Sequence, residues 1–358
     1  MMKTSLSILI IFIALNSLFS QEKIKNNSDS IIFNEPNFGQ KPPGTIIFPV
    51  LRGSYLGQKP PGMRAEIFAP NIISTPFDEA ICSFTPDGKE VFFRILGPPR
   101  GGIYFMKEVD GKWSEPQIAS FLGNYDAKCN LSPDGNKIVF SSGMPLERKG
   151  KSLDHWEIWF VERIKDGWGV PVNLGHPVNS QEYSLICPTI ANSGNIYFYS
   201  ATKSGGLGKG DIWMSEFKNG QYSHLINLGT PVNTEFWEND PFIAPDESYL
   251  IFQSTREGTH ESGDLFISFK DKNGKWTEPI NMGETVNASY SGEGNPMVSP
   301  DGKYFFFSGG KINYKKYIDE PISYRDKMQI LNNPGNMSED IFWIDAKIIE
   351  DLKPMELK

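Results

Sequence analysis

Ser132-Pro133-Asp134-Gly135, followed by Lys137-Ile-Val-Phe-Ser141, joins a tight turn to a strand of β-branched and aromatic residues. Four variants of this unit recur along the chain, at Thr85-Pro86-Asp87-Gly88, Ala191-Asn192-Ser193-Gly194, Ala244-Pro245-Asp246-Glu247 and Ser299-Pro300-Asp301-Gly302. Successive copies are 47 to 59 residues apart, measured at the proline or its equivalent. A repeat of this period indicates a propeller or a solenoid.

Three further strands complete each repeat, and the first of them precedes the turn, as in Asp240-Pro-Phe-Ile-Ala244. The third strand carries an acidic residue followed by an aliphatic and an aromatic residue, as in Glu157-Ile158-Trp159. The fourth strand is short and ends in Asn-Leu-Gly or a variant, followed by Val-Asn, as in Asn227-Leu228-Gly229 with Val232-Asn233. Four antiparallel strands per repeat predict the blade of a β-propeller.

The two ends of the chain predict the number of blades. The last copy has three strands, the third within residues 340–349, and no fourth strand follows it. Residues 66–73 resemble the fourth-strand segment at residues 115–119, and pairing them with the last blade would leave no open sheet edge. We therefore expect an all-β propeller of five four-stranded blades, closed by an N-terminal strand. A sixth blade built from residues 24–64 is the alternative, although Gly and Pro dominate that segment.

The Ser-Pro-Asp-Gly turn, the aromatic strand and the segment Asp211-Ile212-Trp213 together resemble the TolB-type, WD-like β-propeller repeat of bacterial exported proteins. The resemblance covers roughly residues 65–350. Proteins with this repeat include the TolB translocation component, the propeller domains of prolyl-type peptidases and oligogalacturonate lyases. The resemblance therefore implies a fold but does not select one function.

Four segments are expected along the chain. Residues 1–20 resemble a secretory signal peptide, because Lys3 precedes an apolar run. Residues 21–64 are interpreted as an extended arm rich in Pro and Gly, residues 65–352 as the propeller and residues 353–358 as a tail. We expect a periplasmic or secreted monomer without a membrane span in the mature chain, since no later stretch is apolar enough.

Charge and cysteine content narrow the classes of partner. A net charge of -8 argues against nucleic acid, which would require a concentrated basic surface. Cys82, Cys129 and Cys187 each precede a turn by a few residues, on successive blades. Because equivalent positions on different blades diverge, we expect three free, buried thiols and no disulfide.

Acidic residues recur seven positions before the turn proline, at Glu79, Asp126, Glu238 and Glu293. Two interpretations of these acids stay open. Each carboxylate could accept hydrogen bonds from the backbone of its neighbouring blade and tie the ring together. Alternatively, the acids could ring one mouth of the channel, where they would hold a cation such as calcium or serve as weak catalytic candidates. No other cofactor is expected.

Basic and aromatic residues occur in the loops expected on the same face. The candidates for ligand binding are Arg94, Arg148, Trp156, Trp237, Arg256 and Lys315. Arginine and lysine suit an anionic ligand, and exposed tryptophans suit stacking against sugar rings. The favoured hypothesis is a non-enzymatic scaffold that binds a protein, a peptide or an anionic glycan on this face. The alternative is a carbohydrate-active hydrolase or lyase that uses the channel carboxylates.

Overall fold

The computed structural model describes residues 48–97, 101–122, 128–146, 150, 152–165, 167–260, 262–289, 292–310 and 322–358. Residues Pro49–Lys358 form one compact unit. The expected signal peptide and the first part of the expected arm, residues 1–47, lie outside the described residues. Among the residues that the structure describes, no helix has both the length and the apolar character needed to cross a membrane.

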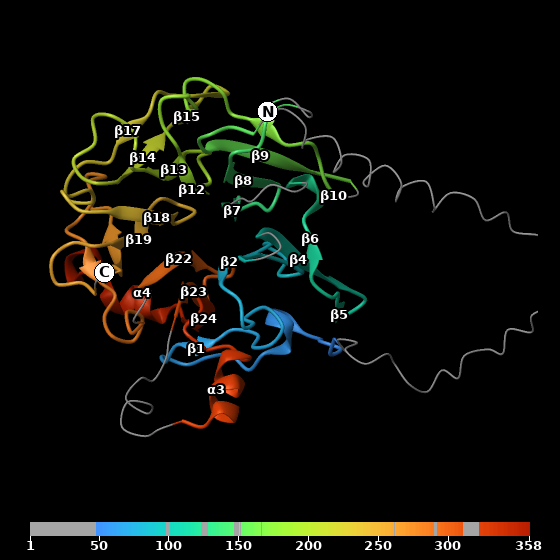
Figure 1. The fold of residues 1–358 in the computed structure, drawn as a ribbon. Coiled ribbons are helices and arrows are strands. Elements are labelled where there is room, and N and C mark those ends of the chain that lie inside the picture. Colours follow the sequence, from blue (N-terminus) through green and yellow to red (C-terminus); the bar gives the residue numbers. More distant parts are fainter. Residues whose placement is uncertain are drawn as a thin grey trace, which may run out of the picture. The chain divides into compact units, whose positions relative to one another are not determined.

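Five small antiparallel sheets form the blades of a propeller, which confirms the expected all-β fold and the count of five (Figure 1). The first blade contains β2 (Glu79–Phe84), β3 (Glu90–Ile95), β4 (Gly102–Val109), β5 (Lys112–Trp113) and β6 (Gln117–Ile118). The second contains β7 (Lys128–Leu131), β8 (Lys137–Ser142), β9 (Glu157–Ile164), β10 (Gly167–Trp168) and β11 (Val172–Asn173). The third contains β12 (Ile186–Ile190), β13 (Ile196–Ser200), β14 (Asp211–Ser215) and β17 (Ile226–Asn227).

The remaining elements complete the ring. The fourth blade contains β18 (Glu238–Ile243), β19 (Tyr249–Ser254), β20 (Asp264–Phe269) and β21 (Ile280–Asn281). The fifth contains β22 (Glu293–Val298), β23 (Tyr304–Gly309), β24 (Asp340–Asp345) and β1 (Glu66–Ile67). A separate hairpin is formed by β15 (Phe217–Lys218) and β16 (Gln221–Tyr222). The helical elements are short: η1 (Ser54–Gly57), η2 (Ser120–Leu122), α3 (Tyr324–Leu331), α4 (Lys347–Leu352) and η3 (Met355–Leu357).

The N-terminal strand closes the fifth blade, as the sequence predicted. β1 pairs antiparallel with β24, with Ile67 opposite Phe342 (Figure 1). Phe68 extends this contact, because its fully buried ring packs edge-on against Trp343, with 5.0 Å between the ring centres. β1 is thereby the fourth strand of the sheet that β22, β23 and β24 form.

The Pro-Asp turns are held by their own side chains. In the second blade, the Asp134 carboxylate accepts hydrogen bonds from the Ser132 hydroxyl at 2.5 Å and the Asn136 N–H at 3.0 Å. Asp301 repeats this arrangement in the fifth blade. Burial alone would raise the pKa of Asp301, but its hydrogen bonds, the one from Ser299 first, lower it to about 2.

The Asn of the Val-Asn motif ties each blade to the connection that follows it. Asn233 accepts a hydrogen bond from the Ile212 N–H at 2.9 Å and donates one to the Ile212 carbonyl at 2.9 Å. Its side-chain amide therefore satisfies the backbone N–H and carbonyl of one residue, as a neighbouring strand would. Asn179 and Asn287 make the same pair of bonds to β9 and β20, and the Ser74 hydroxyl does so on β24.

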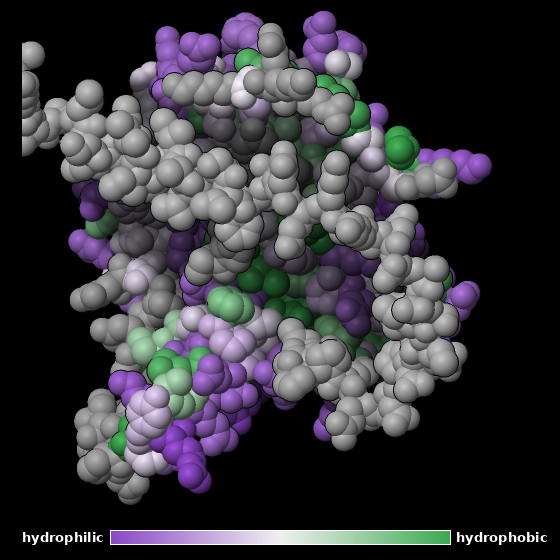
Figure 2. All heavy atoms as spheres, turned by 45° about the vertical axis from the view of Figure 1, so that its right-hand side comes forward, coloured by the Kyte–Doolittle hydropathy of each residue, from purple (hydrophilic) through white to green (hydrophobic). Residues whose placement is uncertain are grey.

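The hydrophobic core lies between neighbouring blades. Phe92 of β3, Phe140 of β8 and Trp159 of β9 belong to one buried cluster that joins the first two blades. Two similar clusters join the second blade to the third and the third to the fourth. Apolar residues are also grouped near the middle of the face shown in Figure 2, while hydrophilic residues dominate its rim.

The inner ring consists of the first strand of each blade, since β2, β7, β12, β18 and β22 contact one another in succession. The register of β12, β18 and β22 shifts at a bulge. The bulge residues Cys187, Asp240 and Asn295 have φ values of 56, 46 and 50°. Each precedes a proline, which cannot donate to the strand ladder. Three blades therefore carry the same proline-marked bulge, and the register of β2 also shifts at the equivalent position, between Ala80 and Cys82.

Candidate functional site

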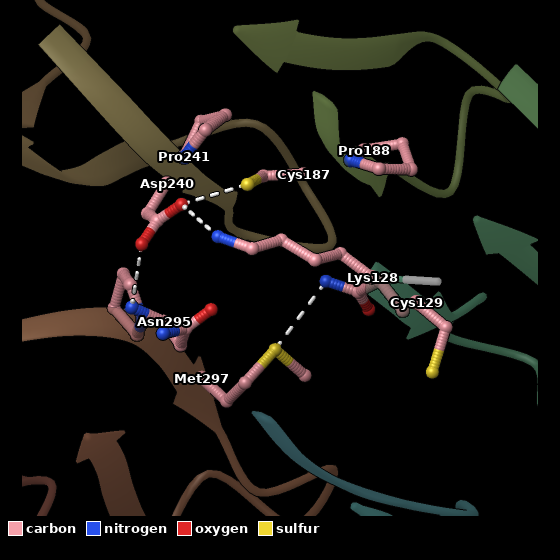
Figure 3. A pocket seen from close by; sticks show the side chains of 10 residues that line it. Lys128, Cys129, Cys187, Pro188, Asp240, Pro241, Asn295 and Met297 are labelled. Atoms are coloured by element: carbon pink, nitrogen blue, oxygen red, sulfur yellow. Dashed lines mark hydrogen bonds and ion pairs between the residues drawn. The ribbon is translucent and has the colours of Figure 1, made fainter. Parts of the chain in front are cut away.

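One position of the inner ring carries a different residue in every blade. It lies five residues before the turn proline or its equivalent and is occupied by Ile81, Lys128, Cys187, Asp240 and Asn295. The last four line a pocket in the central channel, called here the channel pocket (Figure 3). The other residues that line it are Cys129, Asn130, Pro188, Pro241, Pro296 and Met297. The volume of the channel pocket is about 30 Å³.

Asp240 is the centre of a polar cluster in the channel pocket. Its Oδ1 lies 3.2 Å from the Lys128 ammonium and 2.7 Å from the Cys187 sulfur, and both groups donate to it. Its Oδ2 accepts the backbone N–H of Asn295 at 3.3 Å. Three blades other than its own thus direct donors at one carboxylate, as Figure 3 shows.

The charges in this cluster compensate one another. Burial alone would raise the pKa of Asp240, but Lys128 and the Cys187 thiol hold it below its usual value. Burial would likewise lower the pKa of Lys128, but the Asp240 carboxylate raises it above the usual range. Burial, and then the negative charge of Asp240, raises the pKa of the Cys187 thiol. A thiol of raised pKa is a poor nucleophile at neutral pH.

An aromatic pair leads from the cluster toward the surface. Burial raises the pKa of the Tyr199 phenol to about 12, with smaller contributions from Cys187 and Asp240, so Tyr199 lies within range of both. The Tyr199 ring centre is 6.3 Å from that of Trp237, which is 36% exposed. Gly210 permits this packing, because a Cβ there would lie 2.5 Å from the Tyr199 ring and 2.8 Å from the Trp237 ring. The Tyr199 ring therefore lies between Trp237 and the polar cluster.

The structure places three of the four candidate carboxylates within the connections between blades. Glu79, Glu238 and Glu293 are fully buried, and none of them lines the channel pocket. Glu238 accepts hydrogen bonds from the Thr234 N–H at 2.8 Å and the Thr234 hydroxyl at 2.6 Å. Glu79 makes the same two contacts with the equivalent threonine, and Glu293 accepts N–H groups from its own connection. Asp126 lies outside the described residues.

These contacts correct one detail of the structural interpretation. The backbone donors come from the residues just before each strand, and not from the strands of the neighbouring blade. The Ser254 hydroxyl of β19 also donates to Glu238, at 2.9 Å. Each of these glutamates stands at the start of a first strand, and its side chain points back to the residues that lead into that strand. Those residues form the tight connection between two blades. The carboxylate therefore fixes the connection.

The basic candidates that the structure describes are not open rim residues. Arg94 lies in β3 and is 7% exposed. Arg256 donates to a backbone carbonyl at 2.8 Å, and its guanidinium lies 4.8 Å from the centre of the Phe266 ring. Both differ from the exposed loop residues that the sequence led us to expect. Arg148 and Lys315 lie outside the described residues.

Trp156 is partly buried just before β9. Its backbone N–H donates to the Ser184 hydroxyl oxygen at 3.1 Å, and its carbonyl accepts the Leu185 N–H at 2.9 Å. These bonds anchor the start of the third strand to the connection that follows the second blade. The side chain is placed near the same end of the channel as Trp237, because both residues precede strands that begin there.

The two cysteines whose side chains are described occupy different environments. Cys129 and Cys187 are free thiols. Cys187 faces Asp240, whereas Cys129 belongs to the core between the first two blades, and its sulfur points away from Asp240 in Figure 3. Their positions are therefore not equivalent, contrary to the expectation. The side chain of Cys82 is not among those described.

Lys128, Asp240 and Asn295 were missed as site residues by the sequence reasoning. A signal was available in the prolines that directly follow Cys187, Asp240 and Asn295. Proline within a central strand removes a ladder hydrogen bond and therefore implies a bulge, and bulges often redirect a side chain. No such proline follows Lys128, so its orientation had no comparable signal.

A metal site is not formed by the part of the chain that the structure describes. There, no group of three or more His, Cys, Asp or Glu side chains is arranged to hold a metal ion. In the channel pocket, the Lys128 ammonium already balances the charge of Asp240. Calcium at the channel mouth remains a prediction, since one of its proposed ligands, Asp126, is not described.

Comparison with known proteins adds the following. No protein-family model and no curated protein sequence matches the chain. A putative TolB from Agrobacterium tumefaciens is 17% identical over 66% of this chain and 71% of that chain, with a TM-score of 0.42. TolB from Acinetobacter baumannii is 16% identical over 66% of this chain and 50% of its own length, with a TM-score of 0.42. A thermostable family-43 glycoside hydrolase is 15% identical over 67% and 86%, with a TM-score of 0.44.

Proposed function

We propose that this protein is an exported, non-enzymatic scaffold that binds a protein, peptide or glycan at the end of the channel where the first strands begin. The supporting observation is that the blades differ in chemistry at the position that faces the channel. The turn aspartates recur in four blades and the Val-Asn residues in three, because they serve the structure of the repeat. Lys128, Cys187, Asp240 and Asn295 each occur at that position once, so a requirement of the blade does not explain them.

Stability does not explain the ion pair either. Removing Lys128 and Asp240 from water costs on the order of several kcal/mol per ion, and their mutual attraction offsets only part of that cost. Apolar side chains of similar volume are often neutral or stabilising at such positions. A charged pair that lines a channel is therefore better accounted for by recognition than by folding.

The hydrolase alternative has less support. Glycoside hydrolysis uses two carboxylates roughly 5 to 10 Å apart on either side of the scissile bond. Among the described residues that line the channel pocket, Asp240 alone is acidic, and its two oxygens already accept three donors. The raised pKa of Cys187 also disfavours a thiol nucleophile. The similar structures include TolB proteins and a glycoside hydrolase, and they favour neither function.

Glycan and peptide arrays, run beside hydrolysis assays on polyuronates, test the proposal. We expect binding without turnover. Trp237→Ala should weaken binding about tenfold, because a partly exposed aromatic residue at a binding centre commonly contributes that much. Phe217→Ala is the matched control, since Phe217 is 38% exposed and also packs against a tyrosine ring, but on the hairpin of β15 and β16.

Two results would count against this function. One is turnover of any bound glycan by the intact protein, which would favour the hydrolase. The other is an equal loss of binding in Trp237→Ala and Phe217→Ala, which would place the ligand elsewhere.

A further inference from the structure

We infer that the channel pocket binds a carboxylate at the end of the ligand, held by the Lys128 ammonium and the Asn130 amide. This assignment rests on the proposed function and specifies the chemistry of its ligand. Three properties of the pocket point to it, namely its hydrogen-bonding capacity, its charge and its size.

Among the described residues, the channel pocket offers more donors than acceptors. Asp240 already accepts hydrogen bonds from three channel residues. An ammonium has three N–H groups; the Asp240 oxygen takes one from Lys128 and the Cys187 sulfur takes a second, which leaves one for a ligand. The Asn130 amide donates to the Met297 sulfur at 3.3 Å, and a thioether is a weak acceptor. A ligand group that brings oxygen acceptors would therefore match the pocket.

The charges around the channel pocket favour an anion. The positive charge of Arg94 disfavours the protonated form of Lys128, which places the two cations within range of each other. A bound anion would relieve this repulsion. Burial, and then the charge of Asp240, raises the pKa of Glu339 above its usual value.

Size decides how much of the ligand enters. The volume of about 30 Å³ is at least about twice what a cavity needs to hold one water molecule. A carboxylate group fits such a space, but a sugar ring or an aromatic side chain does not. The Lys128 side chain is 24% exposed and therefore reachable. The body of the ligand would remain at the mouth, near Trp237.

Titrations with matched small probes test this subsite. Glucuronate and N-acetylphenylalanine carry a carboxylate on a sugar and on a peptide-like body, and glucose and N-acetylphenylalaninamide are their neutral counterparts. We expect at least one acid to bind about tenfold more tightly than its counterpart, because charge-assisted hydrogen bonds contribute at that level. The acid that shows the preference identifies the source of the carboxylate. Equal affinity within both pairs, or no binding of either acid, would overturn the inference.

Variants of Lys128 test whether the preference for acids over their neutral counterparts arises in the channel pocket. Lys128→Met keeps the length of the side chain without its charge and should remove the preference for acids, whereas Lys128→Arg should retain part of it. Because Lys128→Met leaves Asp240 buried without a cation, the double variant Lys128→Met with Asp240→Leu guards against misfolding. Circular dichroism checks the fold. A folded double variant that still prefers the acid would show that the subsite lies elsewhere.

The same set of variants separates this inference from the proposed function. Trp237→Ala should weaken acids and neutral probes alike, because it removes contact with the body of the ligand. If Trp237→Ala weakens binding while the Lys128 variants change nothing, the binding face stands and the carboxylate subsite fails. If neither change affects the binding of any array ligand, both proposals fail.

Discussion

Glu79 and Glu238 occupy the same position in two blades, but their neighbours differ. Glu238 lies 3.5 Å from the Arg256 guanidinium, and the corresponding position in the first blade is Gly97. Glu79 has no cation there to offset its burial. Burial raises the pKa of Glu79 to about 8, with a smaller contribution from the charge of Asp340. One carboxyl of the repeat is thus held in its neutral form.

This difference predicts that stability falls as the pH rises. A carboxyl whose pKa is about 8 when folded, against an ordinary 4.5, stabilises the fold fully below pH 4.5, and that contribution is lost as the pH rises through 8. The urea midpoint should therefore decrease between about pH 5 and pH 9. Glu79→Gln should flatten this dependence, and urea denaturation at several pH values measures it.

Glu238→Gln is the matched control for this experiment. It removes the partner of Arg256 and should lower stability across the whole pH range without flattening the profile. A Glu79→Gln variant with the pH profile of the unaltered protein would contradict the assigned environment of Glu79.

Asp240 also governs the reactivity of Cys187. Apart from burial, the Asp240 charge is the main cause of the raised thiol pKa, whereas Lys128 lowers it. In Asp240→Asn, the Lys128 ammonium would remain beside the thiol without its carboxylate. We expect iodoacetamide to alkylate Cys187 at least about tenfold faster at pH 7, because each pKa unit changes the thiolate fraction about tenfold.

Peptide mass spectrometry can follow this alkylation residue by residue. Cys129 serves as an internal control, because it is buried in the core between the first two blades and does not contact Asp240. Its rate should stay unchanged. Equal acceleration at both cysteines would mean that the substitution loosens the fold and does not act on the thiol.

At the scale of elements, the closing strand depends on the residue that follows it. β1 has two residues, and Phe68 directly after it is fully buried against the Trp343 ring. Phe68→Ala should lower the free energy of unfolding by about 3 to 5 kcal/mol, since the cavity opens at the joint of two blades. Urea denaturation measures this loss. Phe217→Ala, at a 38% exposed ring, should cost much less, and a similar cost for both would argue against the closure.

The strands and turns were largely predictable from the sequence, because the residues that determine each of them lie close together in the chain. The turn at Asp134 needs only its own Ser and Asn, and the bonds of Asn233 lie within one repeat. The bulges were not predicted, since a strand pattern fixes alternation but not where an extra residue is inserted. One inserted residue changes which side chain faces the channel, as it does at Cys187 and Asp240.

At the scale of the whole molecule, the sequence repeat predicted the propeller ring but drew attention away from the channel cluster. Residues repeated in every blade, such as Glu79 and Glu238, attracted the search for function, but they fix connections. The channel cluster lies where the repeats disagree, because one repeat position carries a different residue in each of the four blades that contribute to it. Its charge pairing between Lys128 and Asp240 becomes visible only when the ring is assembled.

The pairing of β1 with β24 has a consequence for how the chain acquires its fold. β1 is made before any blade is complete, and its partner β24 is among the last strands to be made. Contacts between segments so distant in sequence form slowly, because the closure entropy of the whole intervening chain must be overcome first. A growing chain can therefore assemble its early blades one after another, but the last joint has to await the synthesis of β24. Until then, β1 is an unpaired strand that chaperones or neighbouring chains could capture.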